Sequence, residues 1–123
     1  MLNQIKKKLE EYASECGYAD VAYGKVNKAP KEWNYIVFSR DNLRRSAKSN
    51  ADFKRKYTVA LVHEQYIPQE DEVKLIKKLE EIDGLHLAED DIIYDYEKNP
   101  KTENVAELAV LTFVENLKGY VVR

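Results

Sequence analysis

The stretch from Tyr57 to Gly84 constrains the fold most, because its hydrophobic period changes once along its length. In Tyr57–Glu64, apolar, β-branched and aromatic residues are frequent, as in a pleated strand. After Pro68, apolar residues recur every third position, which predicts a helix from about Gln69 to Asp83 with one apolar face. Acidic residues fill its first turn, where the helix dipole favours anions, and Gly84 can take the left-handed conformation that ends helices. The stretch therefore predicts a strand, a turn and a helix.

A second amphipathic helix is expected over residues 1–17, ended by Gly17. Its apolar face consists of Leu2, Ile5, Leu9, Tyr12, Ala13 and Cys16. This face either docks on the sheet of the same domain or lies on a membrane surface. We favour docking on the sheet, because tyrosine, alanine and cysteine make the face only modestly apolar.

Further strands are expected at Tyr18–Val26, Trp33–Arg40, Asp91–Lys98 and Val105–Glu115. The residues around Pro30 and Pro100 are expected to form loops or turns, and Leu85–Glu89 a short connector. The resulting order is α-β-β-β-α-β-β. Because the strands follow one another in hairpin-connected runs, we predict a mostly antiparallel sheet with both helices on one face. This is an α+β fold in a single domain over residues 1–123.

Three of the expected strands are apolar on both faces. Tyr35 and Val37 oppose Ile36 and Phe38 in one strand, Val59 and Leu61 oppose Ala60 and Val62 in the next, and Ala109, Leu111 and Phe113 oppose Leu108, Val110 and Val114 in the last. Two helices can cover only one face of such a sheet. The other face is covered either by a neighbouring subunit, which we favour, or by curling of the sheet and by loops.

Length, charge and composition exclude several classes of protein. With 123 residues, the chain is long enough for one domain and short for two. Its formal net charge of −2 predicts no general affinity for nucleic acid or anionic membranes. The only cysteine, Cys16, leaves no internal disulfide and is expected to be a buried structural thiol. The start is too charged for a signal peptide, and no apolar run approaches the ~20 residues of a membrane span, so we expect a soluble intracellular protein with no membrane partner.

No residue pattern predicts catalysis or metal binding. His63 and His86 lie 23 positions apart, in no metal-binding spacing. The acidic residues between Asp90 and Glu97 lack the glycine turn of a calcium loop. No serine has the context of a nucleophile elbow, and the four glycines are too scattered for a phosphate-binding loop. We therefore expect no catalytic, cofactor-binding or metal-binding residues, no cofactor and no enzymatic activity.

The segment Arg40–Lys56 is the strongest compositional anomaly. It holds seven Lys or Arg and two Asp, a net charge of +5, so the rest of the chain carries −7. Because the segment is much longer than usual hairpin connections, we predict a long basic hairpin loop over residues 40–56, of which Asn42–Arg55 is exposed and mobile in the isolated subunit. Its candidate contact residues are Arg40, Arg44, Arg45, Lys54, Arg55 and Lys56.

Two interpretations of this basic segment remain open. It can contact nucleic acid phosphates, although Phe53 is its only stacking aromatic. It can instead contact an acidic protein surface, for which Asp91, Asp95 and Glu97 are the candidate counter-patch, expected on one face of a strand. A basic and an acidic patch on one small domain suit head-to-tail association between copies.

Several segments resemble a family of small virion proteins. They are DNLRRS (41–46), KRKYTVALVHEQYIP (54–68), VKLIKKLEEIDGL (73–85), DIIYDYEK (91–98) and TENVAELAVLTFV (102–114). In pattern and order these segments resemble tail terminator, or tail completion, proteins from the morphogenesis clusters of tailed phages and prophages. The resemblance covers most of the chain after about Trp33.

The resemblance implies a non-enzymatic protein of virion assembly at the head–tail junction. Members of this family are small α+β domains that form rings, commonly hexamers. The implied partners are other copies of the chain, the tail-tube and head-connector proteins, and DNA in the lumen of the ring. The implied location is the cytoplasm during assembly and the virion tail afterwards. The alternative function is a nucleic-acid-binding accessory domain that uses residues 40–56.

Overall fold

The computed structural model describes residues 1–24, 33–45, 52–98 and 103–117. Its elements, in chain order, are α1 (Leu2–Cys16), β1 (Asp20–Tyr23), β2 (Asn34–Arg45), β3 (Phe53–Glu64), α2 (Gln69–Glu80), β4 (Leu85–Leu87), β5 (Ile93–Lys98) and β6 (Val105–Leu117).

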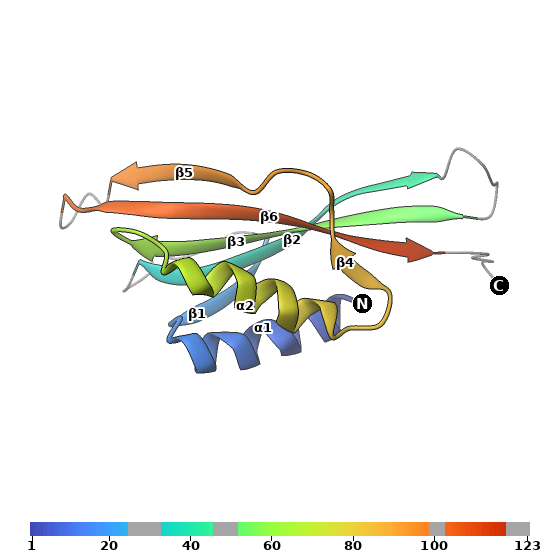
Figure 1. The fold of residues 1–123 in the computed structure, drawn as a ribbon, viewed down its shortest axis with the longest axis horizontal. Helices are drawn as coiled ribbons and strands as arrows, with labels where there is room; N and C mark the ends of the chain where they lie inside the picture. The colour runs from blue at the N-terminus through green and yellow to red at the C-terminus, as the bar shows by residue number, and fades with distance from the viewer. Residues whose placement is uncertain (25–32, 46–51, 99–102, 118–123) are drawn as a thin grey trace.

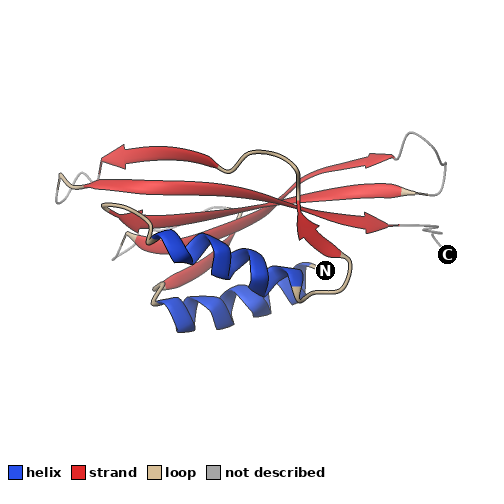
Figure 2. Ribbon diagram, viewed as in Figure 1, coloured by secondary structure: helices blue, strands red, loops and turns tan. Residues whose placement is uncertain are grey.

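The six strands form one sheet in the order β1-β2-β3-β6-β4, and β5 pairs with the same edge of β6 as β4 does, at the other end of that strand. All pairs are antiparallel except β1 with β2. Both helices lie on one side of the sheet (Figures 1 and 2). The predicted α+β fold, with a mostly antiparallel sheet and helices on one face, is confirmed.

The structure corrects several details of the predicted elements. The first strand is shorter than expected and pairs in parallel with β2, whereas a hairpin was predicted. The expected connector at Leu85–Glu89 contains a strand, β4. α2 ends at Glu80 instead of Asp83, because Ile82 N donates to Leu79 O and tightens the chain into a turn. Gly84 follows that turn with a positive φ of 84°. The expected loops around Pro30 and Pro100 lie outside the described residues.

The hydrophobic core lies between the helices and one face of the sheet. Ile5 and Leu9 of α1, and Leu75 and Leu79 of α2, are fully buried there, so the prediction that the apolar face of the first helix docks on the sheet is confirmed. The sheet contributes alternate residues of its long strands: Ile36, Phe38, Tyr57, Val59, Leu61, Ala109, Leu111 and Phe113. Cys16 is only half-buried, at the margin of this core.

Asp71 is buried where the two helices meet the sheet. Its Oδ2 accepts a hydrogen bond of 2.9 Å from Tyr18 Oη, and its backbone oxygen accepts one of 2.7 Å from Tyr12 Oη. Burial raises the pKa of both tyrosines far above the ordinary value. A buried carboxylate is costly unless its oxygens are hydrogen-bonded, and Tyr18 supplies such a bond. Together with the bond from Tyr12 to the backbone oxygen, it holds the start of α2 against α1 and against the residues that follow α1.

Candidate functional site

The basic segment forms paired strands where the sequence analysis expected a loop. Residues 42–45 of β2 pair with residues 53–56 of β3, and the irregularity in register between Arg40 and Asn42 falls at Asp41. The same part of β3 pairs on its other side with the end of β6. Figure 1 shows that these strand ends extend past both helices. We call residues 41–45 and 53–56 the arm.

The expected loop over residues 40–56 is therefore wrong for all of its described part except Asp52. The prediction was based on the length of the segment, which exceeds that of usual hairpin connections. In the arm, ladder bonds order the backbone instead: residues 53–56 of β3 pair with β2 on one side and β6 on the other, and residues 42–45 of β2 pair with β3. The expectation of exposure is confirmed for Asn42–Arg45 and Lys54. Residues 46–51, between the two strands, lie outside the described part, so the predicted mobility stays a prediction.

Strand alternation separates the candidate basic residues into two rows on opposite faces. Arg44, Lys54 and Lys56 line one hollow together with Asn42.

Arg40 is paired with Tyr57, a core residue, so it belongs to the helix side of the sheet. Alternation and register place Arg45 and Arg55 on that side as well. The sequence analysis treated the six residues as one patch, and it missed this division because it assumed a loop.

The hollow beside the arm has a volume of about 430 Å³. The arm residues form one wall, and His86–Asp90 and Val114 line the rest. Lys56 Nζ lies 3.1 Å from Asp90 Oδ2, so one of the three basic side chains is already paired within the subunit. The hollow can accept acidic groups at Arg44 and Lys54, while Glu89 and Asp90 reduce its positive potential.

The basic residues on the helix side have local partners. Arg40 Nε donates a 3.3 Å hydrogen bond to Tyr23 Oη, and the Arg45 guanidinium lies 5.8 Å from the centroid of the Phe53 ring. Phe53 is therefore not available as a stacking platform within the hollow. Tyr57 Oη donates to Glu115 Oε1 at 2.9 Å, and its pKa is raised to about 12, first by burial and then by this bond, with Arg55 acting in the opposite sense.

Two of the candidate acidic residues, Asp95 and Glu97, lie at the other end of the sheet. Asp95 and Glu97 alternate with Tyr94 and Tyr96 in β5, so they share one face, as predicted. Asp91 precedes β5, so the prediction that it shares a strand face with them is wrong. Glu97 pairs with Ala106, whose partner on the opposite side is Glu64. We call Glu64, Asp95 and Glu97 the acidic end.

The acidic end and the hollow lie on the same face of the sheet, which is the face turned away from the helices. Counted along β6, Asp95 pairs with Leu108, whereas Lys54 pairs with Asn116. Eight residues of a strand span about 27 Å. The two groups are therefore too far apart to meet within one subunit.

The middle of this face is apolar. Its residues alternate with those of the core cluster beneath the helices, and Val62, Ala106 and Val114 among them are also buried. Tyr35, Val37, Ala60, Leu108 and Val110 are half-buried, and Ile93 is exposed. We call the face that carries these residues, the acidic end and the hollow the helix-free face. The prediction that three strands are apolar on both sides is confirmed.

The edge strand β5 exposes a second group of residues that the sequence analysis did not select. All six of its residues are exposed, and Tyr94 and Tyr96 point to the helix side. Tyr94 Oη donates to a carboxylate oxygen of Glu72 in α2, and this bond is the main reason that its pKa is raised to about 12. The period-two alternation of tyrosine with acidic residues was the available signal.

Other kinds of site are absent from the part of the chain that the structure describes. No group of three or more His, Cys, Asp or Glu there could hold a metal ion. Neither α1 nor α2 is long and apolar enough to cross a membrane. What the described residues offer is a surface with separated charges and an apolar middle, which is suited to binding another macromolecule.

Comparisons with known proteins agree with the fold. No protein-family model and no curated protein sequence matches the chain. A chain in the solved structure of the virion of a native gene transfer agent particle is similar in fold, with a TM-score of 0.60 and 14% identity over 94% of this chain and 92% of that chain. A second solved chain aligns over 99% of both chains, at 11% identity and a TM-score of 0.44. At these identities, the likeness to the virion chain shows a shared fold and no more.

Proposed function

We propose that this chain is a non-enzymatic structural protein of a phage, prophage or gene-transfer-agent virion. The observation that carries the proposal is the match of nearly the whole chain to the fold of a chain in a gene transfer agent virion. The helix-free face supports it as well, because a half-exposed apolar surface between opposite charges suits a protein that works by assembly.

Within the virion, we propose the role of a ring-forming tail terminator at the head–tail junction. The resemblance of the sequence to tail terminator proteins supports this role. Its partners would be further copies of the chain in a ring, commonly of six, with the tail tube on one side and the head connector on the other. The protein would be cytoplasmic during assembly and part of the tail afterwards. The arm would face a neighbouring copy, the tail tube or the DNA in the lumen.

The test is assembly with a tail-tube protein. The chain is mixed with tail tubes, and the products are examined by negative-stain imaging and native mass measurement. We expect one ring at a tube end and tubes of limited length. Because free subunits of a terminator can be monomeric, the tube must be present. A chain that neither forms rings nor caps tubes would refute the terminator role.

Binding of DNA to the arm is the competing function, and a filter-binding titration separates it from assembly. Phosphate contacts through Arg44 and Lys54 would make the affinity fall steeply with salt. The pairing of Lys56 with Asp90, and the position of Phe53 on the opposite face, favour a protein partner. Tight, steeply salt-dependent DNA binding by a chain that does not cap tubes would favour the competing function.

A further inference from the structure

β5 is an edge strand with one open side. It pairs with β6 along one edge, and no described strand pairs with its other edge. All six of its residues are exposed. The backbone N–H of Tyr96 donates a 2.8 Å hydrogen bond to Oδ1 of Asp95, so a neighbouring carboxylate takes the position that a carbonyl of a further strand would take. An open edge of this kind is a template for one more strand.

The bond of Tyr96 also shows which backbone groups of β5 point outward. In an antiparallel pair, the N–H and C=O groups of alternate residues point to the same edge. Tyr94 and Lys98 therefore direct their backbone groups outward as Tyr96 does, while the other three residues of β5 direct theirs towards β6. The open edge offers the backbone groups of alternate residues to an added strand.

Most of the large apolar side chains that the described residues expose lie in β5 or near it. They are Tyr66, Val73, Ile93, Tyr94, Tyr96 and Val105, and the others are Tyr23 and Leu43. Val105 pairs with Lys98 of β5. Its backbone oxygen accepts a bond from Gln65, the residue before Tyr66. Val73 follows Glu72, which is bonded to Tyr94. Exposed tyrosines gathered in this way are typical of protein–protein interfaces.

Both faces of β5 are acidic. Asp95 and Glu97 lie on the helix-free face. On the helix side, Glu72 is hydrogen-bonded to one tyrosine of the strand, and Glu107 is the cross-strand partner of the other. Lys98 is the only basic residue of the strand. An added strand with basic side chains would therefore be attracted, whereas an acidic strand would be repelled.

We propose that the open edge of β5 binds an extended segment of another protein, in which basic and apolar side chains alternate. The segment would add a strand to the sheet. Its basic side chains would lie beside Asp95 and Glu97, and its apolar side chains would contact Tyr94 and Tyr96. Main-chain hydrogen bonds give such strand addition its affinity, and alternate side chains give it specificity. Binding would replace the bond between Tyr96 and Asp95 and free this carboxylate for a basic side chain.

The other edges of the described sheet suit this partner less well. β1 has only four residues and β4 only three, and the N–H of Leu87 in β4 already donates to Oε2 of Glu80. No described strand pairs with the outer edge of β2 in the arm, but Arg40, Arg44 and Arg45 would repel a basic segment there.

Amide hydrogen exchange of the full chain, followed by NMR, tests the proposal. The probe is a synthetic octapeptide in which lysine and valine alternate. It should slow exchange of the Tyr94 and Lys98 amides at least about 10-fold and leave the β5 amides that bond to β6 unchanged. The same peptide, N-methylated along its backbone, keeps the charge and loses the donors, so it should protect neither amide. No protection by the first peptide, or equal protection by both, would overturn the proposal.

Substitutions in β5 separate strand addition from attraction between charges. Tyr96→Pro removes an outward N–H that the ladder with β6 does not use, and proline is tolerated at such edge positions. It should weaken peptide binding at least about 10-fold. D95K/E97K should weaken it as much, because like charges would meet. Circular dichroism checks that each variant is folded.

A matched control changes the net charge equally at a distance from β5. E10K/D83K reverses two exposed charges, one in α1 and one just after α2, and it should leave peptide binding unchanged. An equal loss of binding in this control would mean that the peptide responds to net charge alone, which would refute a site on β5.

A second copy of this chain is another possible occupant, and the same measurement identifies it. If exchange of the Tyr94 and Lys98 amides slows as the concentration of the chain itself rises, a second copy covers the edge and the proposal of a different partner is wrong.

This inference goes beyond the proposed virion role and can fail separately from it. A chain that binds the peptide at β5 but never caps tail tubes would refute the terminator role and leave the β5 site intact. A chain that caps tubes and does not bind the peptide would do the reverse.

Discussion

The two faces of β2, β3 and β6 belong to the same strands, but the helices cover only one of them. On the helix-covered face, Val59, Leu61 and Leu111 are completely buried and belong to one core. On the helix-free face, neighbouring residues such as Ala60, Leu108 and Val110 remain half-exposed. Because successive side chains of a strand point to opposite sides, this difference arises without any change of backbone.

The comparison shows that the presence of apolar residues in a strand does not tell whether they pack in the core or lie on a surface open to a partner. Both faces contain Val, Leu and Ala, yet only one is covered by the described helices. Both faces stabilise the monomer, since Val62, Ala106 and Val114 of the helix-free face are also buried, but the helix-free face keeps apolar area that only another molecule can cover. The helix-free face also carries the acidic end and the hollow, whereas Arg40, Arg45 and Arg55 lie on the helix side.

The largest expected effect comes from truncating one leucine on each face of β6. Leu111→Ala removes a fully buried side chain and should cost about 3 kcal/mol of unfolding free energy. Leu108→Ala, its matched control on the helix-free face, should cost less than about 1 kcal/mol in dilute protein. Urea unfolding at low protein concentration measures both. Equal losses would mean that the helix-free face is covered within the monomer.

The next effect concerns buried charge. Asp71→Ala leaves Tyr18 Oη without its partner and removes an acidic group from the first turn of α2, so it should cost about 2 kcal/mol. Asp95→Ala, at the exposed acidic end, should change the stability of the monomer by less than about 0.5 kcal/mol. A double-mutant cycle of Asp71→Asn with Tyr18→Phe should show coupling. Additive losses would contradict a direct bond between the two side chains.

The sequence was sufficient for the features that depend on local periodicity. The change of period around Pro68 located β3 and α2, and the alternation of Tyr35–Phe38 showed that both faces of the strand are apolar. The direction and extent of pairing depend on distant residues, which local periodicity does not report. Arg44 gives no strand signal, yet its backbone pairs with that of Lys54 in the arm. The parallel pairing of β1 with β2 cannot be predicted from the side-chain pattern either.

The candidate site was predictable only as a list of charges. The sequence showed that the basic and acidic groups are separate, and β5 confirms that Asp95 and Glu97 share a face. It could not place Arg44 and Lys54 on the opposite face from Arg40, because that division needs the register. It also could not join His86 to the hollow, since β4 was expected to be a connector.

A third prediction concerns alkaline pH. The folded state holds the pKa of Tyr57 near 12, against about 10 in an unfolded chain. The unfolded state therefore loses its proton first, and stability is full below pH 10 and falls as the pH rises towards 12. The loss from Tyr57 alone is on the order of 1 kcal/mol at pH 11. Urea midpoints at pH 8 and pH 11 measure it.

The control for this titration compares the two faces again. Tyr57→Phe should reduce the fall in stability between pH 8 and pH 11, because it removes a group that titrates in the unfolded state. Tyr35→Phe, on the helix-free face, should reduce it less, since Tyr35 is only half-buried, although burial raises its pKa too. An unchanged fall in the Tyr57 variant would contradict a raised pKa at that position.

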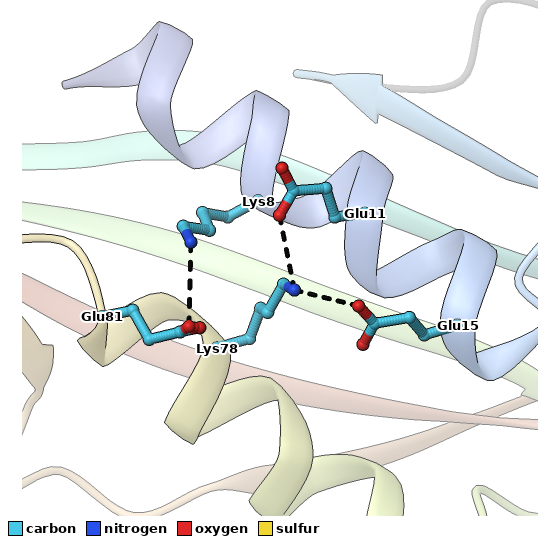
Figure 3. A network of polar contacts seen from close by, with 5 residues as sticks. All are labelled: Lys8, Glu11, Glu15, Lys78 and Glu81. Atoms are coloured by element: carbon cyan, nitrogen blue, oxygen red, sulfur yellow. Dashed lines mark hydrogen bonds and ion pairs between the residues drawn. The ribbon is translucent and has the colours of Figure 1, made fainter.

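The smallest effect on stability is expected from the outer surface of the helices, which contacts neither face of the sheet. Lys78 Nζ lies 3.3 Å from Glu11 and 3.0 Å from Glu15, and it joins α2 to α1 (Figure 3). These bonds raise its pKa, but water and salt screen an exposed pair and ordering the side chains costs entropy. Lys78→Gln should therefore lower the melting temperature less than Asp71→Ala does, and the loss caused by Lys78→Gln should shrink in high salt. A loss as large as that of Asp71→Ala would show that the helices depend on this surface network more than on the bonds beneath it.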